Sequence, residues 1–264
     1  IDKQRESNLI VSVVDSDALG DFPDTTAAEA IRRLSGITVE NDQGEGRYVS
    51  IRGLSGDLNA IAVNGAMVPA PEGGRKVMLD GIPTELLDSI EVYKSLTADK
   101  DADSIGGRIE FKTKKARSLN GTLFKIKLDS SYNDQSKNSN NPKLAMTYGD
   151  MITDNLGHIL GVTYASKQII SYNNETGFPG WTDTENGKRL DDDWEMRYYD
   201  LTRERTGITY DLDYVINDET SIFANLLYNH YEDDELRNKD EYGSLKHGDV
   251  FSDRSEINRI RRDA

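Results

Sequence analysis

Hydrophobic and polar positions follow two different patterns along this chain of 264 residues, and the pattern changes near residue 116. After the change, apolar and polar residues alternate with a period of two, which is typical of β-strands that bury one face. The apolar sets are Phe124, Ile126, Leu128 and Tyr132; Leu144, Met146 and Tyr148; Leu160, Val162 and Tyr164; Ile208, Tyr210, Leu212 and Tyr214; and Ile222, Ala224, Leu226 and Tyr228. We therefore expect about five amphipathic strands here and the start of a sixth at the C-terminal end.

The first part of the chain has the mixed pattern of a compact α+β unit. Thr26 and Glu29 form a capping box at the start of a predicted helix, and Gly36 marks its end. Short strands are expected at 37–40, 47–52, 60–64, 90–94 and 108–114, with a second, shorter helix at 83–89. The pattern thus predicts two domains, residues 1–115 and residues 116–264.

The connections between the alternating segments are short and long in turn. Residues 150–157 and 216–221 are tight, whereas 133–143, about 166–195 and about 232–256 are long and polar. Transmembrane barrels have short turns on one side, long loops on the other and girdles of aromatic residues, and a soluble sandwich has no reason to sort its loops this way. Candidate girdle residues are Tyr132, Tyr148, Tyr198, Tyr199, Tyr214, Tyr228 and Tyr231. We favour antiparallel transmembrane barrel strands over a sandwich.

Composition excludes several classes of protein. Lys and Arg number 32 against 47 Asp and Glu, and the net charge of -15 is the wrong sign for a protein that neutralises a nucleic-acid backbone. No stretch approaches the ~20 apolar residues of a membrane helix. The chain has no cysteine, which removes disulfides, thiolate nucleophiles and Cys-based metal sites.

The first part also carries a family resemblance. LGDFPDTTAAEAIRRLSGITVENDQGEGRYVSIRGL, then AIAVNG, then IPTELLDSIEVYKSLTADKDADSIGGRIEFKTK resemble the plug domain of TonB-dependent outer-membrane receptors, nearest to the Caulobacter-type subgroup. The likeness covers residues 9–115 in the right order. TRERTGITYDLDYVINDETSIFANLLYNHYEDDELR, residues 202–237, resembles the first barrel strands of the same subgroup less sharply.

The resemblance implies energy-coupled uptake of a scarce nutrient across the outer membrane of a Gram-negative bacterium. A plug would sit in a barrel of about 22 strands. TonB and its inner-membrane complex would act through a segment upstream of Ile1. A surface lipoprotein is a further possible partner beside the outer-membrane lipid. Because an open sheet leaves unpaired edges in lipid, we expect this chain to be part of a longer protein.

The stretch YVSIRGLSGDLNAIAVNG places glycine where each of two short strands stops. By the resemblance, Arg52-Gly53 and Asn64-Gly65 are tight turns in the plug, where glycine allows a positive φ. Arg52 would then face carboxylates of the barrel wall. Glu91 and Arg108 are expected to make similar plug–barrel contacts.

The resemblance further implies a ligand site made by plug loops that point outward and by a long barrel loop. Its candidates are Gln43, Glu45, Arg47, Asp57, Asn59, Glu72, Arg75, Phe178, Trp181 and Trp194. The three aromatic residues beside polar ones resemble a platform for sugar rings. Because the loop is rich in carboxylates, which repel an anion, an oligosaccharide is favoured over a ferric siderophore or similar chelate.

No motif indicates an enzyme, a resident metal or a cofactor. Asp99, Asp101, Asp103 and Glu110 have part of an EF-hand spacing but lack its glycine and its helices. His158, His230 and His247 are far apart and have no ligand spacing.

The alternative function is a soluble or surface-exposed β-rich binding module without transport activity. That alternative predicts that Phe124, Ile126, Leu160, Val162 and Leu226 face a protein core.

Overall fold

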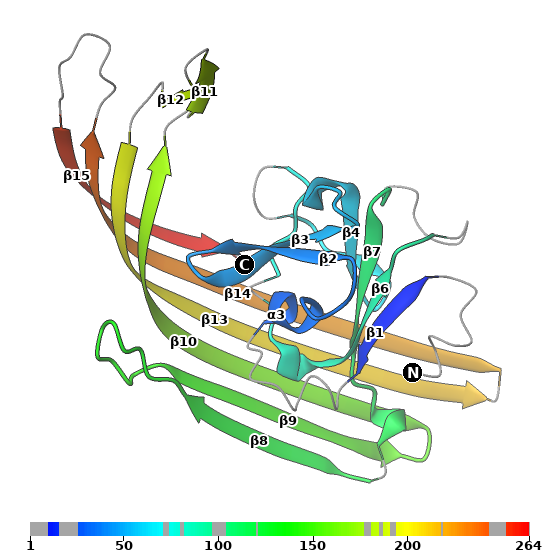
Figure 1. Ribbon diagram of the computed structural model, residues 1–264. Helices are drawn as coiled ribbons and strands as arrows, with labels where there is room; N and C mark the ends of the chain where they lie inside the picture. Colours follow the sequence, from blue (N-terminus) through cyan, green and yellow to red (C-terminus); the bar gives the residue numbers. More distant parts are fainter. Residues whose placement is uncertain are drawn as a thin grey trace.

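The structure, a computed structural model, has two parts: a small α+β domain and a curved antiparallel sheet that holds it on its concave side (Figure 1). It describes residues 10–15, 26–70, 74–79, 82–96, 104–119, 121–176, 181–184, 187–190, 194–217, 219–242 and 252–263, of which 181–184, 187–190, 241–242 and 252–263 are described by backbone only. We call the small domain the plug and the large sheet the wall.

The plug is built on a five-stranded sheet with strand order β1-β6-β7-β4-β5. Its strands are β1 (Val11–Asp15), β4 (Asn59–Val63), β5 (Ala66–Met67), β6 (Leu87–Tyr93) and β7 (Gly107–Thr113), and a separate hairpin joins β2 (Ile37–Asp42) to β3 (Glu45–Ile51). The core lies between this sheet, the hairpin and the helix α3 (Ala27–Ile31), and is centred on Ile31, Ile51 and Phe111. Strand β1 was not predicted.

The predicted helices are shorter than expected. Thr26 does cap α3, since its hydroxyl accepts from Glu29 N at 3.5 Å, but α3 ends at Ile31 in a tighter turn in which Leu34 N donates to Ile31 O. The second predicted helix is only the 3₁₀ turn η2 (Thr84–Leu86). Further 3₁₀ turns are η1 (Gly56–Leu58) and η3 (Ala116–Ser118).

The two predicted glycine turns are confirmed. Val63 pairs with Ala66 across Asn64 and Gly65, whose φ angles are 48° and 91°. Arg52 and Gly53 have φ of 56° and 74° between the bridged residues 51 and 54. Two successive positive φ angles define the type I′ turn, whose twist matches that of paired strands. Glycine therefore stands at the second position of both turns because that position requires a positive φ.

The wall is a six-stranded antiparallel sheet with strand order β15-β14-β13-β10-β9-β8. Its strands are β8 (Leu123–Ser130), β9 (Pro142–Thr153), β10 (Leu156–Thr176), β13 (Trp194–Asn217), β14 (Thr220–Tyr242) and β15 (Ser252–Asp263), and a hairpin of β11 (Trp181–Thr184) and β12 (Gly187–Leu190) lies between β10 and β13. Several of these strands are longer than the alternating apolar segments from which they were predicted. The segments predicted as loops from 166 and from 232 begin as continued, paired strand, because cross-strand pairing holds polar residues as well as apolar ones.

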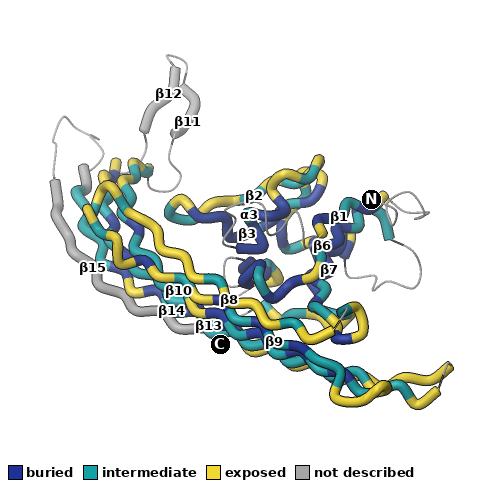
Figure 2. Tube along the Cα trace, turned by 90° about the horizontal axis from the view of Figure 1, so that it is seen from below, coloured by how far each residue is buried: buried dark blue, intermediate teal, exposed yellow. Residues whose placement is uncertain are grey.

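More buried and more exposed residues alternate along much of the wall (Figure 2), because alternate residues of a strand lie on opposite faces of the sheet. Outward residues include Phe124, which is 61% exposed, and Leu226, which is 59% exposed. Tyr199 and Tyr231 are buried on the inner face, so their prediction as girdle residues is wrong. Every lysine and arginine of β8, β9, β10, β13 and of β14 up to 240 occupies an inward position: Lys125, Lys127, Lys143, Lys167, Arg197, Arg203, Arg205, Arg237 and Lys239. Within the described ranges, no helix is long and apolar enough to cross a membrane.

Candidate functional site

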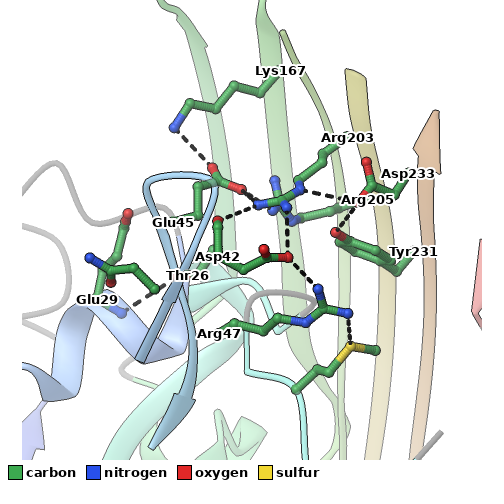
Figure 3. Close-up of polar contacts among 12 residues, drawn as sticks. Thr26, Glu29, Asp42, Glu45, Arg47, Lys167, Arg203, Arg205, Tyr231 and Asp233 are labelled. Atoms are coloured by element: carbon green, nitrogen blue, oxygen red, sulfur yellow. Dashed lines mark hydrogen bonds and ion pairs between the residues drawn. The ribbon is translucent and has the colours of Figure 1, made fainter. Parts of the chain in front are cut away.

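Glu45 is the centre of a buried ion cluster between plug and wall (Figure 3). It follows the turn that joins β2 to β3, and that turn directs its carboxylate toward the inner face of β10 and β13. The carboxylate accepts from Lys167 Nζ at 2.9 Å, Arg203 Nη1 at 3.1 Å and Arg205 Nη2 at 2.5 Å. Glu45 is 2% exposed, so three wall cations share one plug carboxylate away from bulk water.

Arg203 binds both ends of the plug turn. Its guanidinium donates to the carboxylate and to the carbonyl of Asp42, each at 3.1 Å, in addition to Glu45. On the wall side its Nε lies 3.6 Å from Asp233 Oδ2. Arg203 is fully buried, and such a charge is stable only when carboxylates and carbonyls replace its water shell. This residue is therefore the main link between wall and plug in the cluster.

Two further side chains complete the cluster. Arg47 of β3 donates to Asp42 and, at 3.0 Å, to the sulfur of Met78. Arg205 lies 5.5 Å from the ring centroid of Tyr231, in cation–π range. Burial alone would raise the pKa of Glu45, but Arg205, Lys167 and Arg203 hold that pKa well below its usual value. The carboxylate is thus ionised at any physiological pH.

Separate polar contacts join plug and wall on either side of the cluster. Thr113 at the end of β7 donates its hydroxyl to Asp211 Oδ1 at 2.8 Å. Glu85 of η2 lies 2.5 Å from Lys143 Nζ and 3.6 Å from Lys127 Nζ. These pairs are hydrophilic, so they can exchange with water when the plug moves, which an apolar core cannot do as readily.

Between these pairs the plug packs directly on wall glycines. A Cβ at Gly161 would lie 2.7 Å from a Leu86 side-chain atom, and one at Gly207 would lie 3.0 Å from Leu86 and 3.2 Å from Pro83. Gly157 faces Ala116 in the same way. The inner wall is therefore shaped to admit the plug at β10 and β13, where larger residues would collide with it.

The structure disperses the predicted ligand residues of the plug. Glu45 and Arg47 are buried in the ion cluster, so the expectation that they stand on an exposed loop is wrong for these two. Asn59 is also buried, and its amide donates to Val49 O at 2.8 Å. Gln43 stands in the β2–β3 turn beside a hollow of about 380 Å³ that Lys167, Ile169 and Tyr132 also line.

Of the remaining ligand candidates, Asp57 and Arg75 lie together, and Trp194 lies apart from them on the wall. Asp57 accepts from the backbone N of Arg75 at 3.1 Å, which, with other hydrogen bonds, lowers the pKa of Asp57 although burial opposes it. Trp194 is exposed on the outward side of β13. Glu72, Phe178 and the side chain of Trp181 lie outside the described residues. Their role in ligand binding stays a prediction.

The predicted plug–barrel residues make contacts within the plug. Arg52 donates to the carbonyls of Ile105 at 3.2 Å and Gly106 at 3.1 Å, because its left-handed backbone turns the side chain back across the domain. Arg108 lies 2.8 Å from Glu110 and donates to Gly65 O, and Glu91 accepts from Tyr93. For Arg52 and Arg108 the predicted wall partner is replaced by a plug partner.

Sequence reasoning missed the wall half of the cluster. Arg203 and Arg205 stand two apart on the polar side of an amphipathic strand, a spacing that places both on the face toward the plug. The alternation of the strand therefore could have predicted that both arginines face the plug. It could not predict their partners Asp42 and Glu45, because that pairing depends on how the plug docks against the wall. The possible calcium segment at 97–103 lies outside the described residues, and the described ranges contain no group of acidic, histidine or cysteine side chains able to hold a metal ion.

Comparison with known proteins shows which domain family the first part of the chain matches. Residues 3–108 match the family described as TonB-dependent Receptor Plug Domain, so the chain carries a plug domain of that class. A stretch of 117 residues is 32% identical to the vitamin B12 transporter BtuB of Vibrio vulnificus (strain YJ016), and it covers 42% of this chain and 19% of that protein. The Caulobacter-type subgroup stays a prediction.

Solved structures share the fold of plug and wall together. The siderophore receptor PirA of Acinetobacter baumannii superposes with a TM-score of 0.51 at 15% identity, over 98% of this chain and 45% of PirA. The unliganded ferric citrate transporter FecA superposes with a TM-score of 0.52 at 14% identity, over 99% of this chain and 52% of FecA. The Serratia marcescens hemophore receptor HasR, solved as a double mutant with its hemophore HasA and heme, superposes with a TM-score of 0.53 at 15% identity, over 100% of this chain and 47% of HasR. The chain thus spans about half the length of these solved relatives, which are named as receptors and transporters and not as enzymes.

The fold is therefore a receptor plug followed by antiparallel barrel strands, as predicted.

Proposed function

We propose that this chain is the plug and first wall strands of a receptor that takes up a scarce nutrient across the outer membrane of a Gram-negative bacterium. Energy would come from TonB and its inner-membrane complex, acting on a segment upstream of Ile1. The observation that carries the proposal is the Glu45 cluster, in which one plug carboxylate is held by three wall cations. Polar pairs to one side of the wall hold the plug in a defined position at rest, so that a pull on the plug can act against a fixed seat, which energy-coupled uptake requires.

The outward face of the wall argues against the alternative of a soluble binding module. Such a module would bury Phe124, Ile126 and Leu226 in a core, but all three are exposed on the side away from the plug. In a membrane, these side chains would contact lipid and need no protein partner.

Two ligand classes stay open, an oligosaccharide and a ferric siderophore or similar chelate. The charge argument does not decide between them, because wall carboxylates occupy both faces, outward at Asp200, Glu204 and Asp234 and inward at Glu195, Asp211 and Glu235, whereas the lysines and arginines point inward. The aromatic argument for a sugar depends on a loop that lies largely outside the described residues. We keep the oligosaccharide as the first candidate to test and the chelate as the second.

The test is uptake by cells that carry the full-length protein. Radiolabelled maltooligosaccharide, ferric citrate and cyanocobalamin are offered to cells with and without the protein and with and without TonB. We expect uptake of one probe to require both. Strong binding of a probe without TonB-dependent accumulation would overturn transport and favour the binding module.

A pair of variants connects the result to the cluster. Glu45→Gln removes the central charge, and Asp234→Asn removes an exposed outward charge from the same wall. Uptake or its energy requirement should change only in the first. Equal behaviour of the two variants would remove the cluster from the mechanism.

A further inference from the structure

The plug does not close against the whole wall. A cavity of about 690 Å³ separates the plug from the inner face of β14. Its plug side includes Val63, Met67 and Met78, and its wall side includes Phe223, Asn225 and Leu227. The volume is within the range of about 300–1,000 Å³ that small-molecule sites occupy.

The cavity contrasts with the tight packing one and two strands away. At β10 and β13 the plug residue Leu86 leaves no room for a Cβ on Gly161 or Gly207. At β14, in contrast, Phe223 and Leu227 have inward positions and are nevertheless 59% and 36% exposed. Lys115 Nζ of the plug lies over the ring of Phe223, 5.4 Å from its centroid, at the edge of the cavity. The plug is thus packed tightly against β10 and β13, whereas at β14 the cavity separates it from most of the inner face and the contact of Lys115 with Phe223 lies at the cavity edge.

The chemistry of the cavity also differs from that of the rest of the inner wall. Among the side chains that the structure describes, its lining contains no charged one; the polar groups are the amides of Asn64, Asn225 and Asn229 and the hydroxyls of Thr113 and Tyr231. A second hollow, of about 300 Å³, lies over β8, β9, β10 and β13 and is lined by four cations, Lys127, Lys143, Lys167 and Arg205, and by one carboxylate, Asp129. An anion would be drawn to the second hollow, whereas an uncharged molecule with apolar faces fits the first.

We infer that β14 is the side of the wall along which the plug yields, and that the cavity is the start of a passage for an uncharged ligand with apolar faces and hydrogen-bonding groups. The inference rests on the proposed function and specifies its route and ligand class. When the plug is pulled, the seam at β10 and β13 stays packed while the gap at β14 widens. The ligand then moves along an uncharged surface and does not have to break the ion cluster to pass.

These 264 residues contain no cysteine, so an engineered cysteine is the only one among them, and any cysteine elsewhere in the full-length protein is first replaced by serine. Asn225→Cys reports on the cavity, and Thr163→Cys, at a buried inward position of β10, reports on the packed seam. The full-length variants are expressed in cells and treated with a membrane-impermeant fluorescent maleimide, with and without a protonophore. We expect labelling of Asn225→Cys to rise several-fold in energised cells and labelling of Thr163→Cys to stay low in both states.

The outcomes separate the two proposals. If Thr163→Cys gains reactivity as much as Asn225→Cys, or instead of it, the plug moves away from the whole wall and the β14 route is wrong, while energy-coupled uptake stands. If neither variant responds to energisation, the energy coupling itself is contradicted. If a segment of the chain fills the cavity permanently, Asn225→Cys stays unreactive while Thr163→Cys responds, which also overturns the route.

The ligand class has its own control. A neutral, hydroxyl-bearing maleimide and a sulfonated one of similar size are compared at Asn225→Cys and at Ala165→Cys, which lies in the lysine-lined hollow. The neutral reagent should react several-fold faster at Asn225→Cys, and the order should reverse at Ala165→Cys. A preference for the sulfonated reagent at both positions would overturn the assignment to uncharged ligands.

Discussion

At the scale of single residues, the plug is held by a few buried charges whose partners come from distant parts of the chain. Glu45 and Arg203 are separated by 158 positions in sequence and are both almost fully buried. A buried pair of this kind contributes little net stability compared with an apolar pair of the same shape, but removing one partner leaves the other without compensation. The cluster therefore defines where the plug sits more than how stable it is.

Glu45→Gln should loosen the plug. The amide keeps the shape of the side chain but leaves Lys167, Arg203 and Arg205 with too few negative partners, at a cost of about 3 to 5 kcal/mol. Thermal unfolding and limited trypsin digestion of the full-length protein in detergent measure the effect. The exposed replacement Asp234→Asn is the control, with an expected change below about 0.5 kcal/mol. Indistinguishable digestion of the two variants would contradict the role of the cluster.

The same carboxylate gives the stability a defined pH dependence. Because the pKa of Glu45 is lower in the folded protein than the ordinary 4.5, its contribution is fully present above that value and is lost as the pH falls. The difference in unfolding free energy between wild type and Glu45→Gln should therefore be constant from pH 7 to about 5 and shrink below about 4.5. A difference that grows on acidification would contradict this sign. Chemical denaturation at a series of pH values provides the measurement.

At the scale of elements, the contact between plug and wall depends on missing side chains. Gly161→Val would place branched carbons where Leu86 already lies, which should destabilise the docked plug by about 1 to 3 kcal/mol. Thr202→Val on the outward side of β13 adds a branched apolar residue without touching the plug, and it should be near neutral. Thermal unfolding of both variants tests this, and equal midpoints would show that the seam can relax.

The elements also show what the sequence allowed us to predict. Alternation indicated the wall strands and their two faces, and glycine after Arg52 and Asn64 indicated the turns, because both are local properties. The reach of β10 and β14 could not be predicted, since their polar ends are held by neighbours and not by their own pattern. The burial of Glu45 could not be predicted either, because its sequence context is that of a loop residue and its partner Arg203 is known only once the plug is placed against the wall.

At the scale of the whole molecule, the outward residues form an apolar belt next to the short turns. In β10 it covers 156–164, in β13 208–214 and in β14 222–228. Farther from the short turns the outward positions are mostly polar, with Ile170, Met196 and Leu236 among the exceptions. A transmembrane strand needs about 9 to 11 residues, so the belt in β10 has the length of a bilayer span, the belts in β13 and β14 are slightly shorter, and the remaining strand length projects beyond them. This division supports an outer-membrane orientation with the long connections outside.

An arginine in the belt should interfere with insertion. Leu226→Arg places a charge near the level of the acyl chains and should reduce folding stability in lipid vesicles by about 2 to 4 kcal/mol. Asn238→Arg adds the same charge to the outward side of the same strand beyond the belt, where the penalty is about 0 to 1 kcal/mol. Urea titration of the full-length variants in vesicles compares them. A similar loss for both would contradict the position of the belt.

The strict alternation of the wall has a consequence for how such a chain can change in evolution. Losing one residue from the middle of β13 would turn Asp211 and Asp213 toward lipid and Tyr210 and Leu212 toward the plug, provided that the rest of the sheet keeps its register. Losing two would leave every side chain on its own side. Insertions or deletions of an even number of residues in these strands should therefore be tolerated, because they change only the length of the strand. Those of an odd number exchange the inward and outward faces of the part of the strand that follows.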